Sequence, residues 1–102
     1  MPVLGIDVGA ATTKAVVMAD GEILSWYIMQ TGHDINEASE TVISQTLAKT
    51  TFSKDELDYI VSTGYGRNGV RFANKAITEI LCHAKGAYWM MPETRTIIDI
   101  GG

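Results

Sequence analysis

Two aspartates in this 102-residue chain have the type and spacing of residues that do chemistry, because each is followed after one residue by glycine. Asp7 stands in the stretch GIDVGAATTK, at residues 5–14, and Asp99 stands in IIDIGG, at residues 97–102. A carboxylate at the end of a strand is well placed to hold Mg²⁺, often through water. Two such carboxylates facing each other across a cleft predict one site for the metal and the phosphates of a nucleotide, with Asp7 and Asp99 as its metal-binding and catalytic residues.

The turns after these aspartates have the composition of anion-binding loops. Small residues leave backbone N–H groups bare, so that they can turn toward an anion. Threonine hydroxyls add donors, and a lysine adds a point charge that suits phosphate. The predicted nucleotide contacts are Gly9, Ala10, Ala11, Thr12, Thr13, Lys14, Gly101 and Gly102.

The first turn, taken alone, also permits a plain β-hairpin in which Asp7 only caps the turn. It is not a P-loop, because the GxxxxGK[ST] spacing is absent and the next apolar run is typical of a strand. It does not have the glycine spacing of a dinucleotide-binding fold either. The repeat of the pattern at Asp99 favours a nucleotide site over the hairpin.

Three short strands are expected to position the first motif. Their apolar runs and the turn signal at Ala19–Gly21 predict an antiparallel meander. The runs cover residues 3–8, 14–18 and 22–29.

Two helices and two further strands are expected after the meander. Asp34 begins a helix that runs to about residue 50, and a short helical turn begins at Ser53, with Glu56 completing a capping box. A second long helix is predicted from Asn74 or Lys75 to about Trp89. Its expected buried stripe is Ile77, Ile80, Leu81, Ala84 and Tyr88. With strands at 58–64 and 96–100, the chain reads as an α/β fold of order βββ-α-β-α-β.

The composition limits the kinds of partner. The chain is 46% hydrophobic and 20% charged, as in globular domains. Its net charge of −4 and lack of a basic run argue against nucleic acid or an anionic membrane as a partner. No apolar run reaches the roughly 18 residues of a membrane helix, and the start lacks the features of a signal peptide. A lone cysteine, Cys82, excludes an internal disulfide, so we expect a cytoplasmic protein.

The two aspartate motifs resemble the phosphate-1 and phosphate-2 motifs of the actin, sugar-kinase and heat-shock-protein ATPase superfamily, whose ribonuclease-H-like lobe has the same order of elements. The blocks STGYGRNGV at 62–70 and ITEILCHAKGA at 77–87 resemble one branch closely. That branch is the BadF/BadG/BcrA/BcrD-type ATPase family, which includes activators of 2-hydroxyacyl-CoA dehydratases and ATPase subunits of benzoyl-CoA reductase. Its members often carry serine or threonine near positions 10 and 11, where this chain has alanines.

The resemblance implies that residues 1–93 form the first ribonuclease-H-like lobe, with the phosphate-1 loop. Residues 94–102 would supply the opening strand and phosphate-2 turn of a truncated second lobe. Such proteins bind ATP or ADP with Mg²⁺ and form a homo-dimer or pseudo-dimer around one [4Fe–4S] cluster. Hydrolysis drives an electron into a partner acyl-CoA dehydratase or reductase. The cluster cysteines follow the DIGG motif in the family, so the cluster ligands are not in this chain, and Cys82 matches none of them.

The leading hypothesis is therefore the N-terminal fragment of an ATP-hydrolysing reductive activator, inactive as 102 residues alone. Two alternatives are a small-molecule kinase lobe of the same superfamily and a non-enzymatic assembly module. The TGYGR and CHAKGA blocks argue against the kinase.

Four polar residues outside the motifs permit two interpretations each. Arg67 is either a cleft-side residue or an ordinary exposed loop arginine. Cys82 is either a small buried hydrophobe or a ligand. Glu79 and His83 lie four residues apart, as a solvated helical pair or as part of a contact face. Core or lobe-contact positions are expected for Trp26, Tyr27, Trp89, Met90 and Met91.

Overall fold

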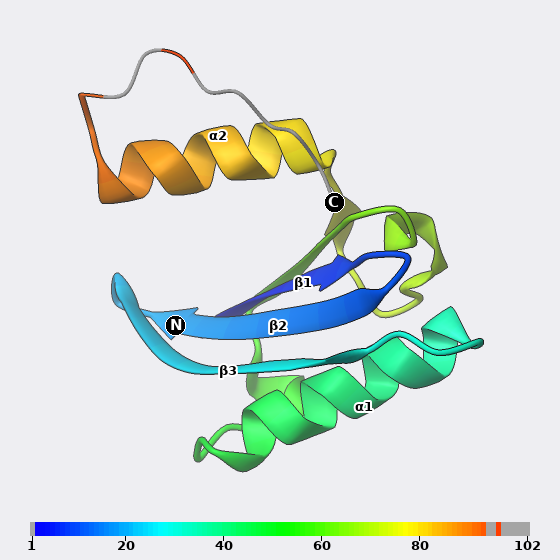
Figure 1. The fold of residues 1–102 in the computed structure, drawn as a ribbon. Coiled ribbons are helices and arrows are strands. Elements are labelled where there is room, and N and C mark those ends of the chain that lie inside the picture. The colour runs from blue at the N-terminus through cyan, green and yellow to red at the C-terminus, as the bar shows by residue number, and fades with distance from the viewer. Residues whose placement is uncertain (1, 94–95, 97–102) are drawn as a thin grey trace.

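A five-stranded mixed sheet forms the centre of the computed structural model, which describes residues 2–93 and 96 (Figure 1). The strands are β1 (Val3–Val8), β2 (Thr12–Ala19), β3 (Glu22–Gln30), β4 (Tyr59–Thr63) and β5 (Lys75–Ala76), arranged in the order β3-β2-β1-β4-β5. The helices are α1 (Ile35–Ala48) and α2 (Glu79–Met90), and two short 3-10 turns are η1 (Lys54–Glu56) and η2 (Arg67–Gly69). The helix α1 covers one face of the sheet, and α2 stands over the other (Figure 1).

The predicted meander is confirmed, because β1 pairs antiparallel with β2 and β2 pairs antiparallel with β3. Asp20 and Gly21 both have positive φ angles, 53° and 79°, in the tight connection between β2 and β3. Such a two-residue turn matches the right-handed twist of the strands it joins. The strand predicted at 58–64 is β4, which pairs in parallel with β1. The central strand β1 therefore has an antiparallel neighbour on one side and a parallel neighbour on the other.

The hydrophobic core lies between the sheet and α1. Alternate side chains of each strand point to the same face, so one set from each strand is buried. The core residues are Leu4, Ile6, Val8, Ala15, Val17, Val42, Ile43, Leu47, Ile60 and Val70. The predicted helix start is confirmed, since Asp34 Oδ1 accepts hydrogen bonds from the N–H groups of Asn36 and Glu37, at 2.9 and 3.2 Å.

The predicted start of the second helix is wrong, because Lys75–Ala76 forms the strand β5 beside β4. Asn74 anchors this strand: its N–H donates to the Ile60 carbonyl at 2.8 Å, and its Oδ1 accepts from the Ile60 N–H at 2.7 Å. Residues 75–76 thus pair with the open edge of β4, although the sequence around them has helical periodicity. The helix begins only at Glu79.

The buried stripe predicted for that helix is also wrong where the structure describes it. Ile80 is 73% exposed and Leu81 is 50% exposed, and Ile77 precedes the helix. The side chains of Ala84 and Tyr88 lie outside the described part. Within the described part, α2 does not pack closely on the strands, and its large apolar side chains that the structure describes are exposed. Of the large side chains expected in the core or at a lobe contact, Tyr27 packs against the core. The exposure of Trp26, Trp89, Met90 and Met91 excludes a core role for them, and their lobe-contact role stays a prediction.

The strand predicted at 96–100 lies outside the described residues, apart from Thr96. The turn at Gly101 and Gly102 lies outside them as well. Within residues 2–93 and 96, no helix has both the length and the apolar character needed to cross a bilayer.

Two leucines give a matched test of where the core lies. Leu4 is 2% exposed, whereas Leu24 is 42% exposed. We expect Leu4→Ala to lower the free energy of unfolding by about 2–5 kcal/mol, because it leaves a cavity between the sheet and α1. Leu24→Ala should cost less than about 1 kcal/mol. Urea unfolding followed by circular dichroism measures both, and equal losses would place the core elsewhere.

Candidate functional site

A tight turn of small residues joins β1 to β2, as predicted. The Gly9 N–H donates to the Thr12 carbonyl at 2.9 Å, which closes the turn. A Cβ atom on Gly9 would lie 2.9 Å from that same carbonyl oxygen, so the turn depends on glycine at this position. Ala10 and Ala11 are exposed at its tip. The turn therefore presents backbone to solvent without a covering side chain.

Two buried threonines hold this turn in place. Thr13 is completely buried, and its hydroxyl lies 2.8 Å from the hydroxyl of Thr31. Thr31 in turn donates from its hydroxyl to the Gly9 carbonyl at 2.8 Å and from its N–H to the Ala11 carbonyl at 2.9 Å. The sequence suggested Thr13 as an open hydroxyl donor, but the structure engages that hydroxyl in the support of the turn. Residue alternation is the reason, because Thr13 lies on the core face of β2 while Lys14 lies on the open face.

Asp7 and Lys14, two of the predicted site residues, are brought together at the end of β1. They are register partners across β1 and β2, and Lys14 Nζ lies 3.5 Å from Asp7 Oδ2. Both side chains are partly exposed, at 34% for Asp7 and 40% for Lys14. The partner that the sequence suggested for them, Asp99, lies outside the described residues, so the facing of the two aspartates stays a prediction.

The end of β4 forms a second wall beside Asp7. Thr63 is the parallel register partner of Asp7, and Gly64 follows it with a φ of +91°. A Cβ atom on Gly64 would collide with Asp7 Oδ1 and lie 2.5 Å from the Val8 carbonyl oxygen. The Gly66 N–H donates to the same carbonyl at 2.8 Å. The sequence predicted a loop here from its three glycines and a resemblance to the family, but not the contact with Asp7, although a glycine directly after a strand is a signal of close backbone approach.

Arg67 ties this loop to the start of α2. Its Nη1 atom donates to the Gly64 carbonyl at 3.0 Å and lies 3.1 Å from Glu79 Oε1. The Arg67 side chain is only 30% exposed, so the interpretation as an ordinary exposed loop arginine is wrong. Glu79 is likewise a partner of Arg67 and not simply part of a solvated helix face.

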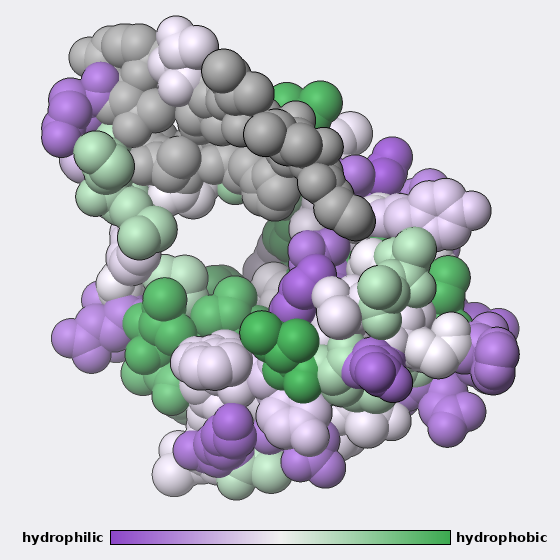
Figure 2. All heavy atoms as spheres, in the orientation of Figure 1, coloured by the Kyte–Doolittle hydropathy of each residue, from purple (hydrophilic) through white to green (hydrophobic). Residues whose placement is uncertain are grey.

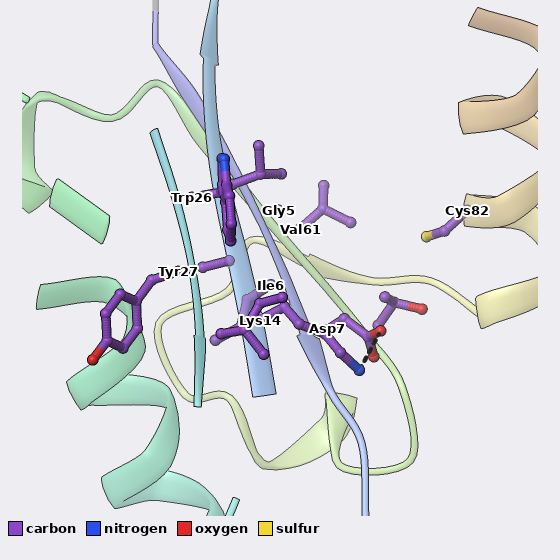
Figure 3. A pocket seen from close by; sticks show the side chains of 12 residues that line it. Gly5, Ile6, Asp7, Lys14, Trp26, Tyr27, Val61 and Cys82 are labelled. Carbon is purple, nitrogen blue, oxygen red and sulfur yellow. Dashed lines mark ion pairs between the residues drawn. The ribbon is translucent and has the colours of Figure 1, made fainter. Parts of the chain in front are cut away.

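A cavity of about 360 Å³ opens on the face of the sheet that α1 does not cover. Figure 3 shows Asp7 and Lys14 pointing toward each other at one end of it, while half-buried Cys82 faces it from α2. Its lining is Gly5, Ile6, Asp7, Lys14, Ala15, Val16, Trp26, Tyr27, Ile28, Val61, Thr63 and Cys82. The charged end suits a phosphate or a cation, and the rest is an apolar floor. Figure 2 shows hydrophobic side chains gathered over the sheet below α2.

The charged end fits Mg²⁺ held through water better than a metal enclosed by protein. Across the described ranges, no group of three or more His, Cys, Asp or Glu side chains is placed to hold a metal ion. Asp7 offers one partly exposed carboxylate. Mg²⁺ commonly keeps several waters and takes one or two carboxylates together with phosphate oxygens.

Comparison with known proteins identifies similar sequences and structures. Residues 4–102 match the model of the BadF/BadG/BcrA/BcrD ATPase family. The activator of lactoyl-CoA dehydratase from Anaerotignum propionicum is 43% identical over 103 residues, which cover 100% of this chain and 39% of that protein.

Two solved structures superpose closely on the whole chain. The Acidaminococcus fermentans (R)-2-hydroxyglutaryl-CoA dehydratase component A matches with a TM-score of 0.90 and 36% identity, over 100% of this chain and 40% of its own. The activator of the 2-hydroxyisocaproyl-CoA dehydratase from Clostridium difficile, with bound ADPNP, matches with a TM-score of 0.87 and 36% identity, over 100% of this chain and 38% of its own.

These matches define the fold as the ribonuclease-H-like lobe of an actin-like ATPase, as the sequence predicted. More narrowly, the chain belongs to the BadF/BadG/BcrA/BcrD ATPase family. It spans 38–40% of the length of the three relatives described above.

Gly64 and Gly32 give a matched test of the contact between β4 and Asp7. Both have positive φ angles, +91° and +72°, but a Cβ atom on Gly32 would meet nothing within 4 Å. We expect Gly32→Ala to cost about 1–2 kcal/mol of unfolding free energy from backbone strain alone. Gly64→Ala should cost a further ~1–3 kcal/mol, because its methyl group also displaces the Asp7 carboxylate and the Val8 carbonyl. Urea unfolding compares the two, and equal losses would show that the ends of β1 and β4 do not touch.

Proposed function

We propose that this chain is the N-terminal portion of an ATP-hydrolysing activator that drives an electron from a [4Fe–4S] cluster to an acyl-CoA dehydratase or reductase. The observation that carries the proposal is the pairing of Asp7 with Lys14 beside a turn of bare backbone. Family membership supports it, as do the relatives described above, which are activators of acyl-CoA dehydratases or a component of one. The bound ADPNP of one relative supports a nucleotide ligand.

The proposed chemistry is phosphoryl transfer to water, in which the protein supplies positioning and charge. Lys14 exchanges its ion pair with Asp7 for a phosphate oxygen, and the exposed backbone at Ala10 and Ala11 donates to the same phosphates. Asp7 then orients the water shell of the metal. A bound Mg²⁺ would neutralise charge that develops on the phosphates.

The opposite wall of the site belongs, in this proposal, to residues outside the described part. Asp99 holds the same water shell as Asp7, and Gly101 and Gly102 form the second phosphate turn. Residues 1–93 then form the first lobe, and residues 94–102 open the second. Two such proteins, or two homologous subunits, share the cluster, whose ligands we place outside this chain.

Substitutions at the ion pair test the proposal in the full-length polypeptide that carries this segment. Asp7→Asn should lower the rate of Mg²⁺-dependent ATP hydrolysis by about 10²–10³-fold, because a neutral amide orients the metal water shell poorly. Lys14→Ala should weaken ATP binding about tenfold, since a phosphate contact is lost.

Lys54→Ala is the matched control for that experiment. Lys54 Nζ lies 3.6 Å from Glu40 Oε2, and neither residue lines the cavity. Removal of the Lys54 side chain should leave hydrolysis unchanged. Wild-type hydrolysis by the Asp7→Asn protein would contradict the proposed role of this site.

Residues 1–102 alone should neither hydrolyse ATP measurably nor bind it tightly. In this superfamily the adenosine pocket is expected mostly on the second lobe, which would lie beyond residue 102. Isothermal titration of the 102-residue chain with ATP and Mg²⁺ measures this directly. An affinity tighter than about 1 μM, near −8 kcal/mol of binding free energy, would contradict the division of the site between two lobes.

A further inference from the structure

One buried hydroxyl beside the proposed metal site has no hydrogen-bond partner in the part of the chain that the structure describes. Thr63 Oγ1 is shielded from solvent and finds no hydrogen-bond partner among the described residues. Buried hydroxyl groups are nearly always hydrogen-bonded, and leaving one unpaired destabilises the fold. Thr63 is also the register partner of Asp7 and lines the same cavity as Asp7 and Lys14. This donor therefore lies beside one of the two carboxylates that the proposed function needs.

The Asp7 carboxylate has different neighbours on its two sides. Its Oδ2 atom faces Lys14 at 3.5 Å. Its Oδ1 atom lies against Gly64, where a Cβ atom would collide with it. Thr63 immediately precedes Gly64 and is the register partner of Asp7, so it belongs to the same strand end as Gly64.

Nucleotide binding would separate the Asp7 carboxylate from the ammonium group of Lys14. If Lys14 turns to a phosphate, as the proposed function requires, the ion pair with Asp7 is lost. A carboxylate that holds the water shell of a metal needs a second hydrogen bond to stay oriented. A threonine hydroxyl supplies one readily, because it rotates to suit its acceptor and χ1 has three staggered positions.

We propose that Thr63 is a positioning residue for Asp7: its hydroxyl donates to the Asp7 carboxylate once Lys14 has moved to the nucleotide, leaving the other carboxylate oxygen directed at the water shell of Mg²⁺. This role rests on the proposed function. It gives the Thr63 hydroxyl an acceptor, because a carboxylate released from Lys14 is free to turn toward β4.

A purely structural role for Thr63 makes the opposite prediction about valine. Valine has nearly the shape of threonine, suits a strand well and removes the unpaired hydroxyl. Its neighbour two residues earlier on the same face of β4 is itself a valine, Val61. If packing were the whole role, Thr63→Val would be neutral or stabilising and would leave nucleotide binding intact.

The test compares Thr63→Val with Thr63→Ser in the full-length polypeptide. Three quantities are measured: the thermal midpoint without nucleotide, the affinity for ADP with Mg²⁺ and with EDTA, and the rate of ATP hydrolysis. For Thr63→Val we expect an equal or higher thermal midpoint, a loss of about 10–100-fold in Mg²⁺-dependent affinity and in rate, and unchanged affinity in EDTA. Thr63→Ser keeps the hydroxyl and should stay within about threefold of wild type in each.

Several outcomes would overturn the inference. The inference fails if Thr63→Val keeps the Mg²⁺-dependent affinity and rate of the wild type. It also fails if Thr63→Val loses affinity equally with Mg²⁺ and with EDTA, or if Thr63→Ser loses as much as Thr63→Val. If Thr63→Val does not fold, Thr63→Ala removes the same hydroxyl and is judged by the same criteria. A wild-type protein that binds no ADP with Mg²⁺ would instead overturn the proposed function itself, a result that involves no Thr63 variant.

Discussion

The alignment of three neighbouring strands brings together the polar residues of the candidate site. Because β1 is central, Asp7 has Lys14 beside it on the antiparallel strand β2 and Thr63 beside it on the parallel strand β4. The apolar residues on the other face fix that register through their burial against α1. A slip of one residue would turn the charged side chains into the core and the core residues outward. The same hydrophobic packing that stabilises the fold therefore also assembles the charged end of the cavity.

Local patterns in the sequence were sufficient to predict most of the fold. The meander, the cap at Asp34 and the strand before Gly64 depend on neighbours close in the chain, and each was predicted. The nearness of Asp7 and Lys14 followed from the meander itself. The features that could not be predicted depend on distant partners: the Thr13 hydroxyl engages a residue 18 positions away. The start of α2 was misplaced for the same reason, since the open edge of β4 decides the conformation of residues 75–76.

In the proposed function, alanines at positions 10 and 11 leave the binding of the anion to backbone N–H groups. Both side chains are exposed and lack polar atoms, so the turn offers N–H groups and no hydroxyl of its own at the tip. Its shape is maintained from below, by the hydroxyl and the N–H of Thr31. A loop built in this way depends on a well-ordered support more than on the chemistry of its exposed residues.

The two helices are attached to the sheet by different forces, and so they respond differently to the surrounding electrolyte. Apolar burial holds α1, and added salt does not weaken that kind of contact. The start of α2 is joined to the loop after β4 by the Arg67–Glu79 ion pair, whose two side chains are 30% and 44% exposed. Partly exposed charges are screened as the ionic strength rises, with a screening length of about 8 Å at 0.15 M salt. Concentrated salt should therefore loosen α2 from the loop while leaving the layer of α1 unaffected.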